Sequence, residues 1–268
     1  MTENRYELIA LREKRRKKLY ILLPILSLSL FILLWIYASS RSEFPSPADV
    51  YARLMQLFER PVRGKNIFGH TLDSLRRIFL ALLFNWTFGI FLGVLMGWNK
   101  RARAFISPLF TAFRAIPPLA WIPLITLWAG TSEFPKILIV IFGSLASVVV
   151  NTQAGIENVD KLYLDVGTVF HANRWQKLFK IAIPSAMDAI FAGIRTSTSA
   201  AWMVVLAAEM LGARSGVGFL ITRGMDSIDM PLVLLSMIAI GLVGAMLAIL
   251  TQLAERILCP WTTRKVSS

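Results

Sequence analysis

The chain has 268 residues, of which 56% are hydrophobic and 17% are charged, and its formal net charge is +13. Soluble domains are roughly 45–50% apolar and about 25% charged, so this composition argues against a soluble, disordered or disulfide-framed protein. The apolar residues occur in blocks of about 20, the number that an α-helix needs to cross the ~30 Å hydrocarbon core of a bilayer. We therefore predict an all-α, polytopic membrane protein, whose positive charge belongs to basic loops rather than to a nucleic-acid site.

The first apolar block, residues 19–38, follows the basic stretch Arg12–Lys18. A cleaved signal peptide is the alternative, but its apolar region would be only about 7–15 residues long, so we expect an uncleaved helix. We predict six spans in all, with five as the alternative. The other five lie at residues 78–97, 106–129, 136–152, 187–210 and 231–254.

Orientation follows from the Lys and Arg residues of the predicted loops. With the N-terminus inside, the inner segments hold 17 of these residues and the outer segments hold 10, seven of them in the single long loop 39–77. Charges far from the span ends weigh less, so we place both termini in the cytoplasm. The chain then consists of a basic N-terminal segment (1–18), a transmembrane domain (19–254) with an inner loop (153–186), and a cytoplasmic tail (255–268).

The long outer loop contains one amphipathic segment. Ser46 or Pro47 marks a turn, and a helix that begins near Ala48 would place Val50, Leu54 and Leu57 on one face. We expect this helix to lie on the membrane surface rather than to form a seventh span.

Small residues at four-residue spacing mark two spans as packed helices. Gly89, Gly93 and Gly97 recur in the second span, and Gly193 belongs to a similar stripe in the fifth. Small residues let neighbouring helices approach closely in lipid, so these glycines are assigned to helix packing.

The predicted third span contains Pro117, Pro118 and Pro123, so it must be kinked or interrupted. Ionisable residues in or beside a span are candidates for a functional role. For Arg195, a structural ion pair with a carboxylate is the alternative to contact with an anionic substrate. The residues assigned to the translocation pathway or its gate are Arg114, Pro117, Pro118, Trp121, Arg195, Ser199, Trp202 and Glu209.

The motifs of the common hydrolases do not occur in the sequence. There is no G-x-x-x-x-G-K-[ST] loop for phosphate, no HExxH motif and only two histidines, His70 and His171. The single cysteine, Cys259, allows no disulfide within the chain and no cysteine-based metal site. We therefore expect no catalytic residue and no bound metal, which leaves transport, channel or scaffold functions.

The inner loop 153–186 is neither apolar nor low in complexity. Asp165–Phe179 is expected to form a short helix–turn–helix, and Pro184 to stop it before the fifth span. A structured loop of this length between two spans is unusual, so we predict a docking element for a cytoplasmic partner. Its residues are Asp165, Val166, Gly167, Val169, Phe170, His171, Arg174, Trp175 and Pro184.

Four ordered segments resemble the permeases of binding-protein-dependent ABC importers, in particular those of the nitrate, sulfonate and taurine type. The inner loop is similar to the family's signature, with Asp165-Val166-Gly167 in place of its EAA and His171 in place of its glycine. Taurine and aliphatic-sulfonate permeases form the most similar group. The remaining matching segments are Ile181–Pro184 at the end of that signature, Phe44–Val50, Arg114–Leu124, and Gly193–Arg195 followed by Trp202, Ala207–Glu209 and Gly216–Phe219.

This resemblance implies the fold of a type I ABC importer permease and a homodimer in the bacterial inner membrane. It further implies two ATPase subunits, bound through the inner loop, and a periplasmic or lipid-anchored solute-binding protein. ATP and Mg²⁺ would be used by the ATPase, and this chain would bind no cofactor of its own. ATP-driven closure would then swing the spans from an inward-facing to an outward-facing arrangement.

The solute would be small and anionic, such as taurine or an alkanesulfonate. A permease for nitrate, bicarbonate, a thiamine-precursor pyrimidine or an aromatic carboxylate is the first alternative. A membrane scaffold or channel that needs no ATPase is the second.

Overall fold

The computed structural model describes residues 3–41, 43–130 and 132–259, with side chains from Tyr20 onward apart from Ile21. Within these ranges every regular element is helical, and the one β-type contact is an isolated bridge between Val62 and Lys65. The long helices are α1 (Glu3–Arg41), α3 (Ile67–Trp98), α4 (Lys100–Ala115), α6 (Glu133–Glu157), α10 (Met187–Met210) and α12 (Met230–Leu258). The short helices are α2 (Pro47–Glu59), η1 (Pro118–Trp121), α5 (Ile122–Ala129), α7 (Lys161–Val169), α8 (Arg174–Lys177), η2 (Leu178–Ala182), α9 (Ile183–Ser185) and α11 (Val217–Asp226).

Five of the described helices are long and apolar enough to cross a membrane: the Leu22–Arg41 part of α1, and α3, α6, α10 and α12. A sixth crossing is present if α4 and the η1–α5 segment count as one span, because these two are bent by 89° at a short break. The break lies at Ile116 and Pro117, as the proline run predicts, since Pro117 and Pro118 supply no amide donor to continue the helix. The prediction of an all-α protein with five or six spans is confirmed.

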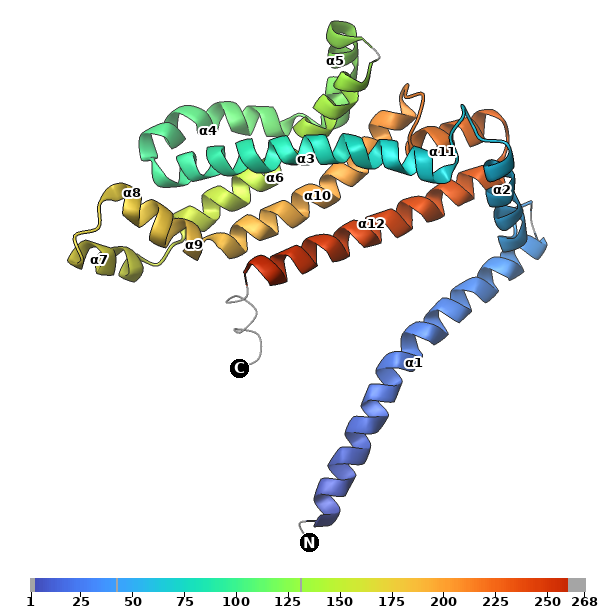
Figure 1. Ribbon diagram of the computed structural model, residues 1–268, viewed down its shortest axis with the longest axis horizontal. Coiled ribbons are helices and arrows are strands. Elements are labelled where there is room, and N and C mark those ends of the chain that lie inside the picture. Colours follow the sequence, from blue (N-terminus) through green and yellow to red (C-terminus); the bar gives the residue numbers. More distant parts are fainter. Residues whose placement is uncertain (1–2, 42, 131, 260–268) are drawn as a thin grey trace.

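Four helices form the bundle. Figure 1 shows α3, α6, α10 and α12 running alongside one another, with α7, α8 and α9 at one end and α2 and α11 at the other. We call these the α7–α8 end and the α2–α11 end. The helix α1 leads away from the bundle, and most of its described side chains are exposed.

Close packing of α3 on α6 depends on the glycine stripe of α3. A Cβ atom placed on Gly93 would lie 2.6 Å from Cβ of Thr152, and one on Gly97 would lie 2.7 Å from Cβ of Ile156. On α10, a Cβ on Gly193 would lie 2.9 Å from Cβ of Asn151 in α6. Distances this short cannot be accommodated without a shift, so these positions require glycine for helix approach.

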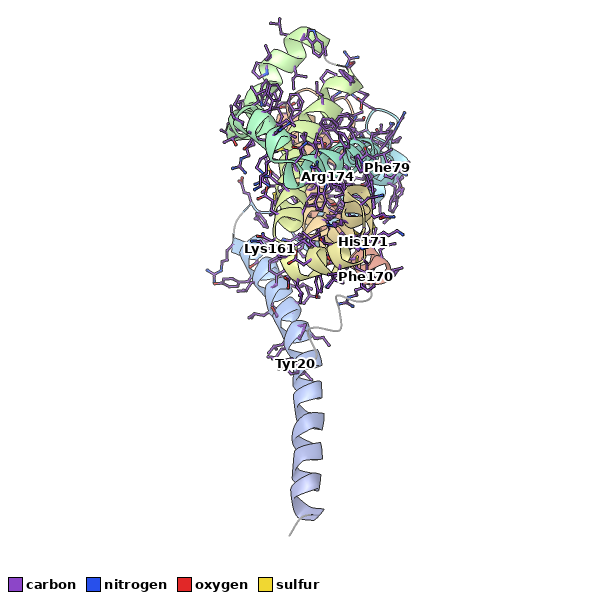
Figure 2. All side chains as sticks on the ribbon, turned by 90° about the vertical axis from the view of Figure 1, so that its left-hand side faces the viewer. Tyr20, Phe79, Lys161, Phe170, His171 and Arg174 are labelled. Atoms are coloured by element: carbon purple, nitrogen blue, oxygen red, sulfur yellow. The ribbon has the colours of Figure 1, made fainter. Side chains whose placement is uncertain are left out.

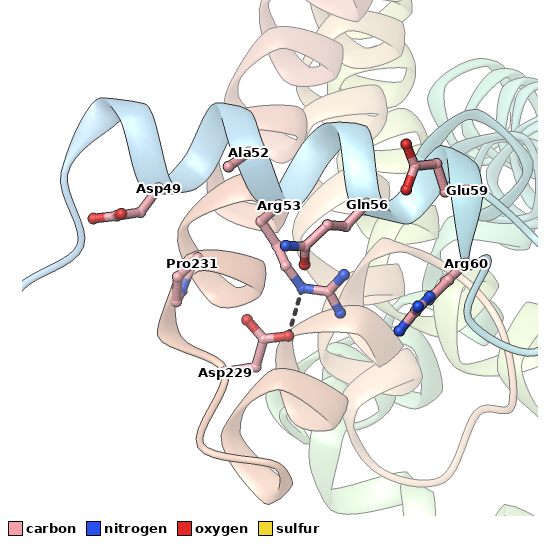
Figure 3. Close-up of a pocket in the computed structure, with 8 residues that line it drawn as sticks. All are labelled: Asp49, Ala52, Arg53, Gln56, Glu59, Arg60, Asp229 and Pro231. Atoms are coloured by element: carbon pink, nitrogen blue, oxygen red, sulfur yellow. Dashed lines mark hydrogen bonds and ion pairs between the residues drawn. The ribbon is translucent and has the colours of Figure 1, made fainter.

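The predicted amphipathic helix is α2. Ser46 caps it through a capping box with Asp49, and hydrogen bonds from the Ser46 hydroxyl and amide hold the pKa of the Asp49 carboxyl below its usual value. Val50 and Leu57 are buried against the bundle, and Arg53 pairs with Asp229 at the start of α12 at 2.6 Å. Figure 3 shows this pair between α2 and the start of α12, among the residues that line a cleft.

Candidate functional site

The turn that joins α7 to α8 ends α7 with two backbone hydrogen bonds. The amide of His171 donates to the carbonyl of Thr168, and the amide of Ala172 donates to the carbonyl of Gly167, both at 2.9 Å. This pair of bonds is the Schellman motif, which places its C′ residue in the left-handed region. His171 occupies that position with φ of 53°. His171 therefore lies where the backbone favours glycine, and histidine tolerates this conformation better than a branched residue would.

The segment after the turn restarts at once as a helix. Asn173 and Gln176 form a reciprocal capping box with two hydrogen bonds of 2.8 Å, so α8 begins at Arg174. Lys177 then reaches back to the hydroxyl of Thr168 at 2.7 Å. These contacts fix the angle between α7 and α8 and make the α7–α8 turn (residues 161–177) one compact unit.

Gly167 allows α7 to lie close to the segment that follows α8. A Cβ atom on Gly167 would lie 2.7 Å from Cδ1 of Ile181. The helix continues from α8 through the π-helical η2 and past Pro184 in α9, and a single turn residue, Ala186, separates α9 from α10. The expected stop at Pro184 therefore falls two residues later.

The tip of the α7–α8 turn is apolar and exposed. Val169 is 74% exposed and Phe170 is 80% exposed, and Trp175 stacks on Phe179 with its ring centroid 6.1 Å away. Figure 2 views the molecule from this end and shows Phe170 and His171 beside each other on its surface. Asp165, Val166 and Arg174 are also exposed, so the turn offers apolar side chains bordered by charged ones.

A second cluster, which contains the predicted pathway residue Glu209, lies at the α2–α11 end. Glu209 has no exposed surface, and its carboxylate is paired with the guanidinium of Arg77 at 2.5 Å. The same guanidinium binds Glu133 through two hydrogen bonds of 2.6 and 3.0 Å, and donates to the carbonyl and hydroxyl oxygens of Ser215, each at 2.9 Å. All three nitrogens of Arg77 are thus occupied, which leaves this arginine unsuited to binding a solute.

The Glu209 carboxylate also helps to cap α11. Three consecutive amides at the start of α11 each donate to a side chain from α3 or α10, which satisfies donors that a helix N-terminus otherwise leaves free. Gly216 donates to Nδ1 of His70 at 3.2 Å, Val217 to Oγ of Ser74 at 3.0 Å, and Gly218 to Oε2 of Glu209 at 3.0 Å.

Two glycines permit the close contact between the start of α11 and α10. Gly216 has φ of 113°, and a Cβ there would overlap the Glu209 carboxylate. A Cβ on Gly218 would lie 2.5 Å from the carbonyl oxygen of Leu206. The sequence run from Ala207-Ala208-Glu209 to Gly216-Val217-Gly218 therefore encodes the docking of α11 on α10.

Arg77, Ser74 and His70 lie outside the predicted spans because the second span was predicted to begin at residue 78, and Glu133 lies outside them because the fourth was predicted to begin at residue 136. The helix α3 begins at Ile67 instead, so Arg77 belongs to it. The four-residue spacing of the glycine stripe could have assigned Arg77 to the buried face of this helix. Extended backward from Gly89, it passes Asn85 and Ala81 to Arg77, all of them buried on the same face.

The other predicted pathway residues are distributed along the bundle. Arg114 is exposed at the end of α4, and Trp121 packs edge-on against Phe142 with ring centroids 5.3 Å apart. Pro117 and Pro118 lie at the bend between α4 and η1. The η1 segment, which holds Pro118 and Trp121, packs against α10, the helix of the remaining predicted residues.

On α10, the predicted residues have different surroundings. Arg195 pairs with Glu255 of α12 at 3.1 Å, which is the structural role that the sequence left open. Trp202 is buried and donates from Nε1 to the carbonyl of Ile240 at 3.2 Å. Ser199 is exposed and donates to the carbonyl of Arg195 at 3.3 Å.

Comparison with known proteins gives a consistent set of similarities. The family described as binding-protein-dependent transport system inner membrane component matches residues 86–264, a range that contains the α7–α8 turn and Glu209 but not Arg77. Over 258 residues, the chain is 30% identical to SsuC of Bacillus subtilis, a protein assigned to aliphatic sulfonate transport, covering 94% of this chain and 92% of the relative.

Two further relatives have other solutes in their names. The taurine transport permease TauC of Escherichia coli is 29% identical over 81% of this chain and 79% of the relative. The bicarbonate transport permease CmpB of Synechococcus elongatus is 30% identical over 88% of this chain and 89% of the relative.

A chain of a bacterial alginate ABC transporter, solved with an alginate-bound periplasmic protein, superposes with a TM-score of 0.62 at 15% identity, covering 92% of this chain and 97% of the other.

Proposed function

Because this chain belongs to the family of inner membrane components of binding-protein-dependent ABC importers, we propose that it docks an ATPase through the α7–α8 turn and forms the pathway of a small anion. As such a component it is a multi-pass membrane protein and not the ATPase itself. The proposal assigns two copies of this chain to one transporter, with two ATPase subunits and a solute-binding protein. ATP and Mg²⁺ are used by the ATPases, and this chain holds no cofactor.

The observation that carries the docking role is the rigid, exposed and apolar tip of the turn. Phe170 and Val169 project from a helix end that is closed by the Schellman motif and by the bond from Lys177 to Thr168. Exposed aromatic residues on a fixed backbone are the usual energetic centre of a protein interface, and charged residues form its rim. Val169 and Phe170 insert into a groove of the ATPase in this proposal, and Arg174 pairs with an acidic residue on its rim.

Docking at this end fixes the orientation that we propose. The α7–α8 end and both termini are cytoplasmic, and the α2–α11 end faces the solute-binding protein. The cleft between α2 and α12 has a volume of ≈ 790 Å³ and is lined mainly by charged side chains (Figure 3). Three carboxylates and two arginines line it: Asp49, Glu59, Asp229, Arg53 and Arg60. A polar, charged surface suits an interface that must form and separate in each transport cycle.

For the solute, we propose a small anion, with taurine or an alkanesulfonate as the first candidate class and bicarbonate as the second. The support is the set of relatives, which are named for sulfonates, taurine and bicarbonate. Among the arginines predicted for the pathway, Arg195 is neutralised by Glu255, whereas Arg114 has no ion pair within the described residues. We therefore propose that Arg114 binds the anionic solute.

The docking role is tested by replacing Phe170 with alanine. Loss of an interface aromatic is expected to cost about 1–3 kcal/mol of docking, so the ATPase should co-purify poorly while the permease dimer survives. Phe134→Ala is the matched control, because Phe134 is also exposed but lies at the opposite end, at the start of α6. If Phe170→Ala leaves ATPase binding and coupled hydrolysis intact, the turn is not the docking element.

A further inference from the structure

An apolar groove lies between α3 and the segment from α8 to α9, outside the residues assigned to the pathway. Its volume is ≈ 540 Å³, within the roughly 300–1,000 Å³ typical of ligand sites. One wall is the α3 face that contains Phe91 and Trp98. The other wall comes from α8, η2 and α9, and its residues are Arg174, Trp175, Leu178, Phe179 and Ile183.

The depth of the groove matches one leaflet of a bilayer. It follows α3 from Thr87 to Asn99, and twelve residues of helix span about 18 Å. Half of the hydrocarbon core is about 15 Å. Among the described residues that line the deep end, only Thr87 has a hydroxyl, which already donates to the carbonyls of Leu83 and Phe84 in its own helix. The deep part of the groove therefore offers apolar contact and no free polar group.

The mouth of the groove is different in character. Arg174 and Trp175, the first two residues of α8, lie there. The Arg174 side chain is exposed and makes no hydrogen bond or ion pair to any described residue, and the described lining contains no acidic side chain. An arginine that is not neutralised binds phosphate well, because its planar donors match the phosphate oxygens. Tryptophan favours the boundary between hydrocarbon and head groups.

We propose that this groove holds one acyl chain of an anionic phospholipid, whose phosphate head group pairs with one edge of the Arg174 guanidinium and leaves its other donors to the acidic residue on the ATPase rim. Figure 2 shows Arg174 on the face of the α7–α8 end, and the groove places it beside the end of α3. A lipid bound in this way contacts α3 and the segment from α8 to α9 together. It therefore connects the bundle to the turn that we assign to ATPase docking, and lipid composition would affect the position of that turn.

Native mass spectrometry of the full chain in detergent, with no ATPase present, tests this site. Dioleoylphosphatidylglycerol and dioleoylphosphatidylcholine have the same acyl chains and differ in head-group charge. We expect one phosphatidylglycerol per chain, bound about fivefold more tightly than phosphatidylcholine, since one cation at an anionic membrane surface contributes about 1 kcal/mol. Because the assay contains no partner subunit, its failure is separate from a failure of ATPase docking.

Four variants locate the lipid. Arg174→Gln should reduce phosphatidylglycerol affinity to that of phosphatidylcholine, and Arg174→Lys should retain most of it. Lys180→Gln is the matched control, because Lys180 is an exposed cation of the same segment that does not line the groove, and it should change nothing. Thr87→Phe fills the deep end and should weaken both lipids. Equal affinity for the two lipids would overturn the site, as would an unchanged lipid affinity of the Arg174→Gln or the Thr87→Phe variant. Loss of the bound lipid when the chain forms a dimer would overturn it as well.

Discussion

His171 shows how one residue determines the shape of the docking turn. Its left-handed conformation costs an ordinary side chain about 1–2 kcal/mol, less for histidine and nothing for glycine. We expect His171→Gly to keep or slightly raise the Tm of the purified chain and to retain ATPase binding. His171→Val should lower both, because a β-branched residue disfavours this region. A His171→Gly variant that loses ATPase binding while remaining folded would show that the imidazole itself makes the contact.

Glu209 and Arg77 form the most buried charge pair among the described residues. Removing one partner of such a pair costs about 3–5 kcal/mol, and Glu209→Gln should fall near the lower limit because Glu133 still pairs with Arg77. Thermal unfolding of the detergent-solubilised chain measures this loss. Glu133→Gln is the control, since the Glu133 side chain is 60% exposed and its loss should cost less than about 1 kcal/mol. A larger loss of stability in Glu133→Gln than in Glu209→Gln would show that Glu209 is not the main partner of Arg77.

Among the elements, the α4–α5 bend is the one with the clearest consequence for transport. Replacing Pro117 and Pro118 with alanine restores two amide donors and allows a straighter helix across the 89° break. We expect the variant to assemble with its ATPase but to show altered solute uptake in proteoliposomes. If the variant is stably expressed and uptake is unchanged, the bend serves packing alone.

Patterns of spacing were enough to predict several elements. The amphipathic α2, the broken third span and the helix–turn–helix of the inner loop all follow from local sequence, because burial of one face, missing amide donors and capping residues act within a few positions. The extent of α3 did not follow, since Arg77 looks like a loop charge until Glu209 and Glu133 are known to surround it. The ion pairs themselves join residues more than 50 positions apart, and no local pattern encodes them.

For the whole molecule, docking of an ATPase at the α7–α8 end requires one orientation in the membrane. Reporter fusions should place residues 60 and 220 outside and residues 100, 165 and 265 inside, although residue 265 lies beyond the described residues. The basic segments next to the spans favour this arrangement. An outside signal at residue 165 would remove the α7–α8 turn from the reach of any ATPase.

A site-specific photo-crosslink determines whether the tip of the α7–α8 turn lies against an ATPase. A photoreactive residue is placed at Phe170, or at Met225 in α11 as the control, which is exposed at the opposite end. After irradiation of the assembled transporter, we expect a crosslink to the ATPase from position 170 and none from position 225. A crosslink to the ATPase from position 225, or its absence from position 170 in an assembled complex, would show that the α7–α8 turn is not the docking element.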